Sequence, residues 1–208
     1  MKIKVCGLRD PRNIAALARL RPDYMGFVFY APSPRYADEL PPEALDGLSA
    51  EICRTGVFVD ATEETIRATA RRYGLGAIQL HGAEPPALCR KLGKEYTVIK
   101  AFGIGDRNDL ERTDAYEGTC DYYLFDTRTA ARGGSGRKFD HTLLQSYRGD
   151  TPYLLSGGLG PEDAPVLARS GDPRCAGLDL NSRFETSPGI KDILQVERFM
   201  KTIKNHLQ

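Results

Sequence analysis

The sequence predicts an α/β protein whose residues 1–208 fold as one (β/α)8 barrel, the TIM-barrel architecture. Short segments rich in apolar, β-branched and aromatic residues recur about every 20 to 30 residues, which is the repeat of a βα unit. The intervals between them show helical spacing of apolar residues, and no evident linker divides the chain. Eight such units in succession favour a closed barrel over an open sheet.

Eight segments are predicted to be buried strands, because their apolar residues follow one another without the polar alternation of a half-exposed strand. They are residues 2–6, 24–29, 55–59, 77–80, 97–101, 122–126, 152–155 and 176–180.

Helix signals are clearest in three of the intervals between these strands. Asp10 and Pro11 have the residue types of an N-cap and a first helical position. Either Asp60 or Thr62 caps a second helix, whose apolar face consists of Ile66, Ala70 and Tyr73. The last helix has the longest apolar face, formed by Val196, Phe199, Met200, Ile203 and Leu207.

Proline weakens two other intervals. The interval after Tyr30 is fragmented by Pro32, Pro34, Pro41 and Pro42 and is the weakest predicted helix. In the seventh interval Pro161 suits a first turn, but Pro165 falls where an interior hydrogen bond would be lost. That helix is expected to start late or to bend.

Composition and charge narrow the classes of partner and cofactor. The net charge of +1, from 29 basic and 28 acidic residues, provides no bulk attraction to nucleic acid or to a membrane surface. No apolar run approaches the roughly 20 residues that span a bilayer, and the charged N-terminus does not resemble a secretory signal. Five widely spaced cysteines without a CxxC pair, and only three histidines, predict no metal site. We therefore expect a cytoplasmic protein in a reducing compartment.

Polar residues and glycines gather where the predicted strands end. In a barrel of this class the chemistry lies at the carboxyl ends of the strands. The residues at or just after these ends are Cys6, Gly7, Arg35, Asp60, His81, Gly82, Asp126, Gly157, Gly158 and Asp179. This placement predicts an active site at one end of the barrel.

Cys6 and Asp126 are the candidates for proton transfer, although each has a structural alternative. Cys6 is either a buried thiol that packs as a small hydrophobe, or a base or nucleophile whose pKa a cation or helix terminus lowers. Asp126 follows an apolar run, so partial desolvation raises its pKa and suits a proton donor. It could equally cap the next loop, and Asp60 and Asp179 also lie at strand ends. The remaining four cysteines are predicted to be structural.

Two glycine-rich loops have the composition of phosphate-binding loops. Residues 132–138, which include Gly134, combine glycines with basic flanks, but they lack the spacing of a nucleotide P-loop. They form either an anion site, a mobile lid or both. Gly157 and Gly158 follow the seventh strand, where barrels often bind phosphate.

Arg35 and His81 are further candidates for substrate contact. Arg35 lies in a proline-stiffened loop and either grips a carboxylate bidentately or points to solvent. His81 either orients a substrate, transfers a proton or forms a structural hydrogen bond.

Taken in chain order, the strand ends and glycine-rich loops described above resemble the signatures of the phosphoribosylanthranilate isomerase family. The resemblance extends from Lys4 to about Asp192, nearly the whole chain. The segments that carry it are 4–8, 26–29, 33–36, 56–59, 79–82, 125–127, 133–136, 155–159 and 187–192.

The resemblance implies a cofactor-free Amadori rearrangement of N-(5-phosphoribosyl)anthranilate to 1-(2-carboxyphenylamino)-1-deoxyribulose 5-phosphate. It implies that Asp126 is the general acid at the ribose ring oxygen and Cys6 the general base at C2. Arg35 matches the contact to the anthranilate carboxylate. The remaining expected substrate-binding residues are His81, Gly134, Gly157, Gly158, Asp179, Asn181 and Ser182, with the glycines after the seventh strand and the segment after Asp179 at the phosphate end.

The chain departs from the family pattern at the phosphate end. Many members have two serines and a glycine where this sequence has Asn181, Ser182 and Arg183. Arg183 either contacts phosphate or points to solvent.

Two other functions remain to be weighed against the isomerase, and both keep the barrel. One is a histidine-pathway aminosugar isomerase, which would use two aspartates and show half-barrel symmetry. The other is a non-catalytic barrel that binds a phosphate ligand. The expected partner is a small phosphorylated molecule, and the expected state is a monomer or weak homodimer.

Overall fold

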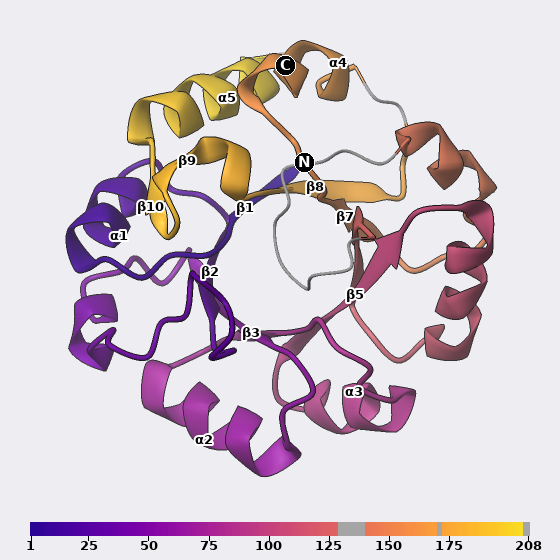
Figure 1. Cartoon of the computed structure of the whole chain (residues 1–208), viewed down its shortest axis with the longest axis horizontal. Helices are drawn as coiled ribbons and strands as arrows, with labels where there is room; N and C mark the ends of the chain where they lie inside the picture. The colour runs from indigo at the N-terminus through magenta and orange to yellow at the C-terminus, as the bar shows by residue number, and fades with distance from the viewer. Residues whose placement is uncertain (129–139, 170–171, 206–208) are drawn as a thin grey trace.

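The computed structural model describes residues 1–128, 140–169 and 172–205, and it confirms the predicted barrel. Eight parallel strands pair in chain order, and β1 closes the ring by pairing with β8 (Figure 1). The strands are β1 (Lys2–Val5), β2 (Tyr24–Val28), β3 (Cys53–Phe58), β4 (Ala77–Leu80), β5 (Thr97–Ile104), β6 (Tyr122–Thr127), β7 (Tyr153–Leu155) and β8 (Cys175–Leu180).

All eight predicted strands are present; β4 has the predicted bounds, and the others differ from the predictions by one to three residues at one or both ends. β3 begins at Cys53 because Cys53 pairs with Tyr24 of β2, which holds two further residues in the sheet. β5 continues to Ile104 because that residue pairs with Thr127 of β6. Pairing between neighbours, which the local sequence does not specify, sets these boundaries.

The described intervals between the strands contain short α-helices and 3₁₀ helices. The α-helices are α1 (Pro11–Ala18), α2 (Glu63–Tyr73), α3 (Pro86–Leu92), α4 (Ala164–Leu167) and α5 (Ile193–Asn205). The 3₁₀ helices are η1 (Pro42–Leu45), η2 (Arg107–Tyr116), η3 (His141–Ser146), η4 (Pro161–Asp163) and η5 (Ser182–Phe184). In the described residues, the intervals after β2, β5 and β6 contain only 3₁₀ helix. Prolines explain the first, and the Asn, Asp and Thr residues of η2 favour turns over α-helix.

The predicted helix starts are confirmed at Asp10 and Thr62. The Asp10 carboxylate accepts a hydrogen bond from the Asn13 N–H at 2.7 Å, and the Thr62 hydroxyl accepts one from the Thr65 N–H at 3.2 Å. Asp60 is not the cap of α2; its carboxylate accepts a bond from the Ala83 N–H at 2.6 Å. The seventh interval is divided as expected, with Pro165 in the first turn of α4, directly after η4.

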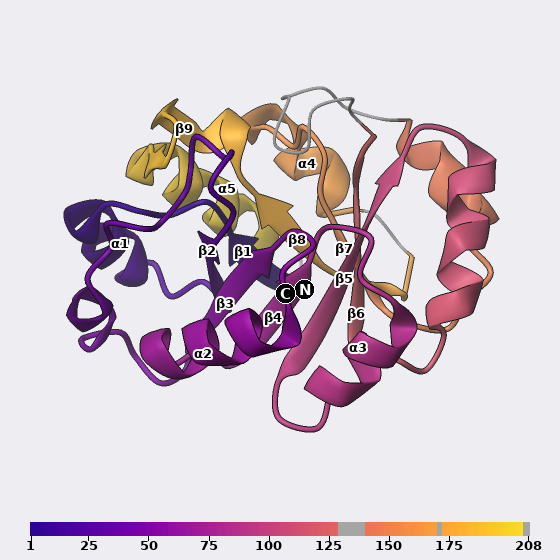
Figure 2. The same ribbon diagram turned by 60° about the horizontal axis from the view of Figure 1, so that its bottom comes forward.

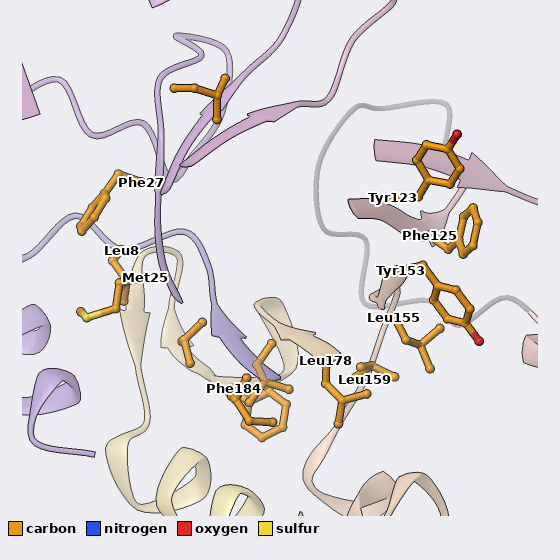
Figure 3. Packing of buried hydrophobic residues seen from close by; sticks show 14 of the residues in the cluster. Leu8, Met25, Phe27, Tyr123, Phe125, Tyr153, Leu155, Leu159, Leu178 and Phe184 are labelled. Atoms are coloured by element: carbon orange, nitrogen blue, oxygen red, sulfur yellow. The ribbon is translucent and has the colours of Figure 1, made fainter. Parts of the chain in front are cut away.

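The core has two layers, one between strands and helices and one inside the barrel. Figure 3 shows part of the outer layer, where rings such as Tyr123, Phe125 and Tyr153 pack together. A smaller buried cluster lies on the opposite face of the strands and consists of Ile99, Ala101, Leu124 and Leu154. Because strand side chains alternate between faces, Asp126 lies on the same inner face as Leu124.

A two-stranded hairpin follows β8, where the sequence predicted only a helical interval. Strands β9 (Glu185–Ser187) and β10 (Ile190–Lys191) pair antiparallel. The turn contains Gly189, whose φ of 90° favours glycine. Figure 2 shows β9 at the upper end of the barrel, toward which the strands run. Among the described residues, no helix is both long and apolar enough to cross a bilayer.

Candidate active site

A cavity of about 750 Å³ opens at the carboxyl ends of the strands. It brings together nine of the ten residues predicted to form the site, namely Cys6, Arg35, His81, Asp126, Gly157, Gly158, Asp179, Asn181 and Ser182. Gly134 lies outside the described residues. Other lining residues include Val28, Tyr30, Val57, Gln79 and Ser156. The apolar side chains of the lining come mainly from β2 and β3, and most of the polar ones come from the other strand ends and from the loop after β2.

The alternation of strand residues explains why these side chains meet. Lys4 and Cys6 share the inner face of β1, while Ile3 and Val5 belong to the outer core. The same period places Asp179 inside β8 and His81 at the inner end of β4. Side chains that lie far apart in the sequence consequently converge on one axis.

Cys6 lies above a buried ion pair. The Lys4 ammonium lies 2.8 Å from the Asp179 Oδ1 atom, and these two residues are also paired in the β1–β8 register. Burial raises the pKa of the Cys6 thiol, while the charge of Lys4 lowers it and that of Asp179 raises it. Gly26 leaves the thiol its space, since a Cβ there would lie 2.7 Å from the sulfur.

The Asp126 carboxyl lies at the end of β6 with a side chain that is 22% exposed. Burial raises its pKa to about 6, against the opposing hydrogen bond from the Thr127 N–H, and the charge of Asp179 raises it further. A raised pKa of Asp126 is what the sequence predicted. A carboxyl with this pKa can carry or release a proton near neutral pH.

His81 lies between Gln79 and Asp126. Its Nδ1 atom is 2.8 Å from the Gln79 side-chain nitrogen, and its Nε2 atom is 3.6 Å from the Asp126 Oδ2 atom. Burial lowers the pKa of His81 to about 4, and the charges of Lys100 and Lys4 lower it further. The imidazole is therefore neutral at neutral pH. When Gln79 donates to Nδ1, the ring hydrogen is on Nε2 and faces the cavity.

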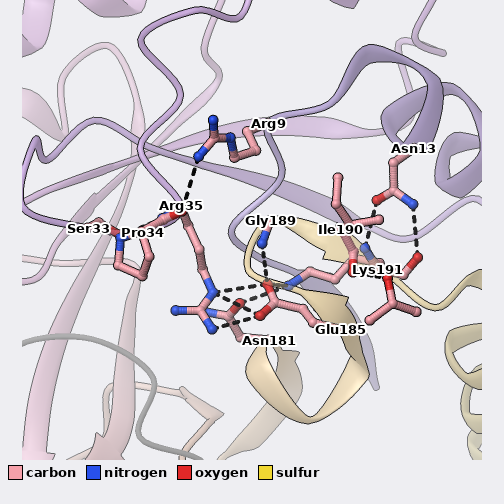
Figure 4. A network of polar contacts seen from close by, with 11 residues as sticks. Arg9, Asn13, Ser33, Pro34, Arg35, Asn181, Glu185, Gly189, Ile190 and Lys191 are labelled. Carbon is pink, nitrogen blue, oxygen red and sulfur yellow. Dashed lines mark hydrogen bonds and ion pairs between the residues drawn. The ribbon is translucent and has the colours of Figure 1, made fainter.

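Arg35 is buried, so its alternative interpretation as a solvent-facing side chain is wrong. Its Nε and Nη2 atoms donate to the Glu185 carboxylate at 2.9 and 2.7 Å (Figure 4). The Lys191 ammonium lies 2.6 Å from the same carboxylate and 2.8 Å from the Asn181 side-chain oxygen. Burial opposes the charge of Glu185, but Arg35 and Lys191 outweigh it and hold the pKa of Glu185 below its usual value. Burial lowers the pKa of Lys191 to about 8.

The glycine turn after β7 has the backbone geometry of an anion-binding loop. Gly157 and Gly158 both have positive φ angles, 86° and 66°. A Cβ on Gly157 would lie 2.5 Å from the Thr127 hydroxyl oxygen. Within the described part of the chain, neither glycine N–H donates to a protein acceptor. These amides are therefore available to a phosphate.

Several sequence candidates lie outside the cavity. Arg183 donates to Glu162 at 2.6 Å on the surface, with a side chain that is 40% exposed, so it follows the solvent-facing alternative. Asp60 and the four cysteines other than Cys6 do not line the cavity.

Four residues in or beside the site were not predicted from the sequence, namely Lys4, Gln79, Glu185 and Lys191. Lys4 carried a usable signal, because a charge within a buried strand requires a partner. Glu185 and Lys191 carried no comparable signal, because the hairpin that holds them was not predicted.

Comparisons with known proteins find the same family over nearly the whole chain. A family model described as N-(5'phosphoribosyl)anthranilate (PRA) isomerase matches residues 3–202. An N-(5'-phosphoribosyl)anthranilate isomerase from Parabacteroides distasonis is 47% identical over 206 residues, covering 98% of this chain and 93% of the relative.

Solved structures show the same similarity. A phosphoribosyl anthranilate isomerase in complex with reduced 1-(o-carboxyphenylamino)-1-deoxyribulose 5-phosphate has a TM-score of 0.83 and 32% identity, covering 99% of each chain. Monomers of the dimeric phosphoribosylanthranilate isomerase from Thermotoga maritima have a TM-score of 0.80 and 33% identity, again covering 99% of each chain.

Proposed function

The chain belongs to the phosphoribosylanthranilate isomerase family and catalyses that isomerisation in tryptophan biosynthesis, and we propose that Asp126 is its general acid and Cys6 its general base. The observation that supports these roles is the convergence of the two side chains, from β6 and the end of β1, on one cavity. Each step of the reaction is driven by a proton transfer and no electrons are exchanged with a cofactor, so one acid and one base are sufficient.

Asp126 acts first in this proposal. It donates its proton to the ribose ring oxygen while the C1–O bond breaks, and the anthranilate nitrogen lone pair forms the C1=N bond of a protonated Schiff base. Its pKa of about 6 supports the role, because a measurable fraction is protonated at neutral pH. The neutral His81 beside it adds no positive charge that would favour the ionised carboxylate.

Cys6 acts second. The thiolate removes the C2 proton, the C2–H electron pair forms the C1=C2 bond, and the C1=N pair returns to nitrogen. The resulting enolamine then loses its hydroxyl proton and gains one at C1 to give the ketone. The charge of Lys4 supports the thiolate, although burial favours the thiol. The reactive combination of thiolate and protonated Asp126 is thus a minor form of the free enzyme.

The two ends of the substrate bind at different parts of the cavity in this proposal. Arg35, after β2, binds the anthranilate carboxylate, and Gly157, Gly158, Asn181 and Ser182, after β7 and β8, surround the phosphate. His81 and Asp179 contact the sugar between them. The contribution of Gly134 stays a prediction from the sequence.

We also propose that the protein is a cytoplasmic monomer or weak homodimer whose residues 1–208 form one domain. The closed β1–β8 pairing supports the single domain. In the described residues the large exposed hydrophobic side chains are Met1, Val166 and Leu194, a small apolar surface for a permanent interface. The Thermotoga maritima relative is dimeric, so sedimentation analysis is the appropriate measurement.

The catalytic assignment is tested by following the loss of substrate fluorescence with Cys6→Ser and Asp126→Asn. Each variant is expected to lower kcat by about 100-fold or more while it remains folded, because each removes one proton-transfer group. Cys53→Ser and Asp150→Asn are matched controls outside the cavity and should retain activity. If Asp126→Asn stays within about tenfold of the wild type, another group is the acid.

A further inference from the structure

The Arg35 guanidinium uses only one of its two edges to bind Glu185. Its Nε atom donates to both carboxylate oxygens, at 2.9 and 3.1 Å, and Nη2 donates to Oε2 at 2.7 Å. Figure 4 shows Nη1 pointing away from Glu185. Within the described part of the chain, Nη1 has no hydrogen-bond acceptor. A guanidinium has five N–H donors, so the Nη1–Nη2 edge can still bind a second carboxylate bidentately.

Glu185 is itself fixed from the opposite side. Its Oε1 atom also accepts bonds from the Lys191 ammonium at 2.6 Å and from the Gly189 N–H at 3.1 Å. The Asn13 side chain of α1 binds the backbone N–H and carbonyl of Lys191 at 2.8 and 2.9 Å, which anchors β10. Glu185 therefore belongs to a rigid part of the molecule and does not hang freely over the cavity.

The Arg35 side chain also has little freedom to turn. Gly7, with a φ of 81°, leaves room for its stem, since a Cβ there would lie 2.6 Å from the Arg35 Cδ atom. Stem and guanidinium are thus held at two points, and the Arg35 residue is only 7% exposed.

The charges of the cluster favour an incoming anion. Arg35 and Lys191 supply two positive charges and Glu185 one negative charge, and all three side chains are at least nine-tenths buried. One net positive charge remains in a poorly hydrated place, which leaves an attraction for a carboxylate that a surface arginine would not have.

We propose that Glu185 is a positioning residue for substrate recognition, which holds Arg35 by its Nε–Nη2 edge so that the Nη1–Nη2 edge receives the aromatic carboxylate of the substrate. This inference rests on the proposed role of Arg35 and adds the residue that orients it. The opposite interpretation is that Glu185 occupies the carboxylate site and must leave before substrate binds. The bonds from Lys191 and Gly189 argue against that, because a departing carboxylate would leave the buried Lys191 ammonium without its anion.

The test measures binding of two stable ligands by calorimetry. One is reduced 1-(o-carboxyphenylamino)-1-deoxyribulose 5-phosphate, and the other is the same molecule without the carboxylate. The Kd of the ligand without the carboxylate, divided by the Kd of the ligand with it, reports recognition of the carboxylate alone. A loss of folded protein or of the phosphate site affects both ligands and does not change this ratio. Arg35→Met is expected to reduce this ratio by about tenfold or more, and Glu185→Gln by about fivefold or more.

Three further variants make the result decisive. In the Arg35→Met background, Glu185→Gln should produce no further change in the ratio, because its effect passes through Arg35. Glu185→Asp keeps the charge with a shorter reach, should give an intermediate ratio, and replaces the Gln variant if that does not fold. Glu95→Gln is the matched control, since it removes a carboxylate that binds Arg67 on the surface.

The outcomes separate the inference from the function on which it rests. An unchanged ratio in Arg35→Met overturns the proposed carboxylate site and the inference with it. A reduced ratio in Arg35→Met with an unchanged ratio in Glu185→Gln overturns the inference alone. Tighter binding of the carboxylated ligand by Glu185→Gln would show that Glu185 competes with the substrate.

Discussion

At the residue scale, the Asp126 carboxyl, which is the proposed proton donor, illustrates how such a group is held at the expense of stability. Its inner-face position at the end of β6 keeps it away from water, and the nearby Asp179 adds negative charge, so its pKa rises to about 6. Lys4 opposes this rise but is already paired with Asp179. The ionised form is consequently disfavoured in the folded protein.

Replacing this carboxyl by a neutral amide should therefore stabilise the fold above pH 6. An unfolded aspartate has a pKa of about 3.9, so folding takes up a proton between about pH 4 and 6, and stability falls as pH rises through that window. Asp126→Asn is expected to raise the free energy of unfolding by up to about 3 kcal/mol at pH 8. Urea denaturation at pH 8 and pH 4 measures it.

The gain should be small at pH 4, where only the unfolded state is partly ionised, and should disappear below about pH 3, where Asp126 is protonated in both states. An equal gain at both pH values would show that the effect is steric and not electrostatic. Asp150→Asn, at an exposed position, is the control and should leave the free energy of unfolding unchanged at both pH 8 and pH 4.

At the element scale, each βα unit is stabilised by its own local contacts. The α2 helix shows this most clearly, because the Thr62 hydroxyl caps its first turn, Glu63 and Glu64 follow, and Gly74 ends it with a φ of 59°. The ion pair between Glu63 and Arg67 has the favourable i,i+4 spacing. None of these groups lines the cavity, so changes here should affect stability without changing chemistry.

Removal of the α2 cap tests this separation. Thr62→Ala leaves the Thr65 N–H without its acceptor and is expected to lower the free energy of unfolding by about 1 kcal/mol. Thermal unfolding gives the stability, and the fluorescence assay should show unchanged kcat. Thr69→Ala, inside the same helix, should be neutral or slightly stabilising, because alanine has the higher helix propensity. A loss as large as that of Thr62→Ala would exclude capping as the cause.

At the scale of the whole molecule, the barrel closes between the first and last strands of the ring. Lys4 and Asp179 are opposite one another in that register, and their charged groups form an ion pair inside the barrel. Both residues are at least 95% buried. The same pair lies directly beneath Cys6, so closure of the fold and the electrostatics of the site depend on the same two side chains.

Breaking this pair should therefore destabilise the whole fold. Lys4→Met leaves the Asp179 charge buried, and among the described residues the Ser156 hydroxyl, at 3.4 Å, is then its only side-chain hydrogen-bond partner. The free energy of unfolding is expected to fall by about 3 kcal/mol or more, as measured by urea denaturation. Lys2→Met, in the same strand, should change it by less than about 1 kcal/mol, because the Lys2 ammonium makes a cation–π contact with Tyr24 and, among the described residues, no ion pair. Equal losses in both variants would argue against the ion pair.

The sequence by itself determined the repeating architecture and much of the site. Continuous apolar runs identified all eight strands, and the types of residue at Asp10 and Thr62 identified two helix starts, because these signals depend only on neighbouring residues. The positions of Cys6, Asp126 and His81 followed from the same pattern, since every parallel strand ends at the same rim. The resemblance to a family added the reaction.

Only the tertiary structure decided which groups touch. The different surroundings of Asp60, Asp126 and Asp179 depend on partners that are distant in sequence, namely Ala83 and His81 after β4 and Lys4 in β1. The bidentate pairing of Arg35 with Glu185 joins residues 150 positions apart through a short hairpin that has no strong local signal. Such contacts, and the pKa values that depend on them, are set by the closure of the barrel, which brings distant side chains together inside a region that water enters poorly.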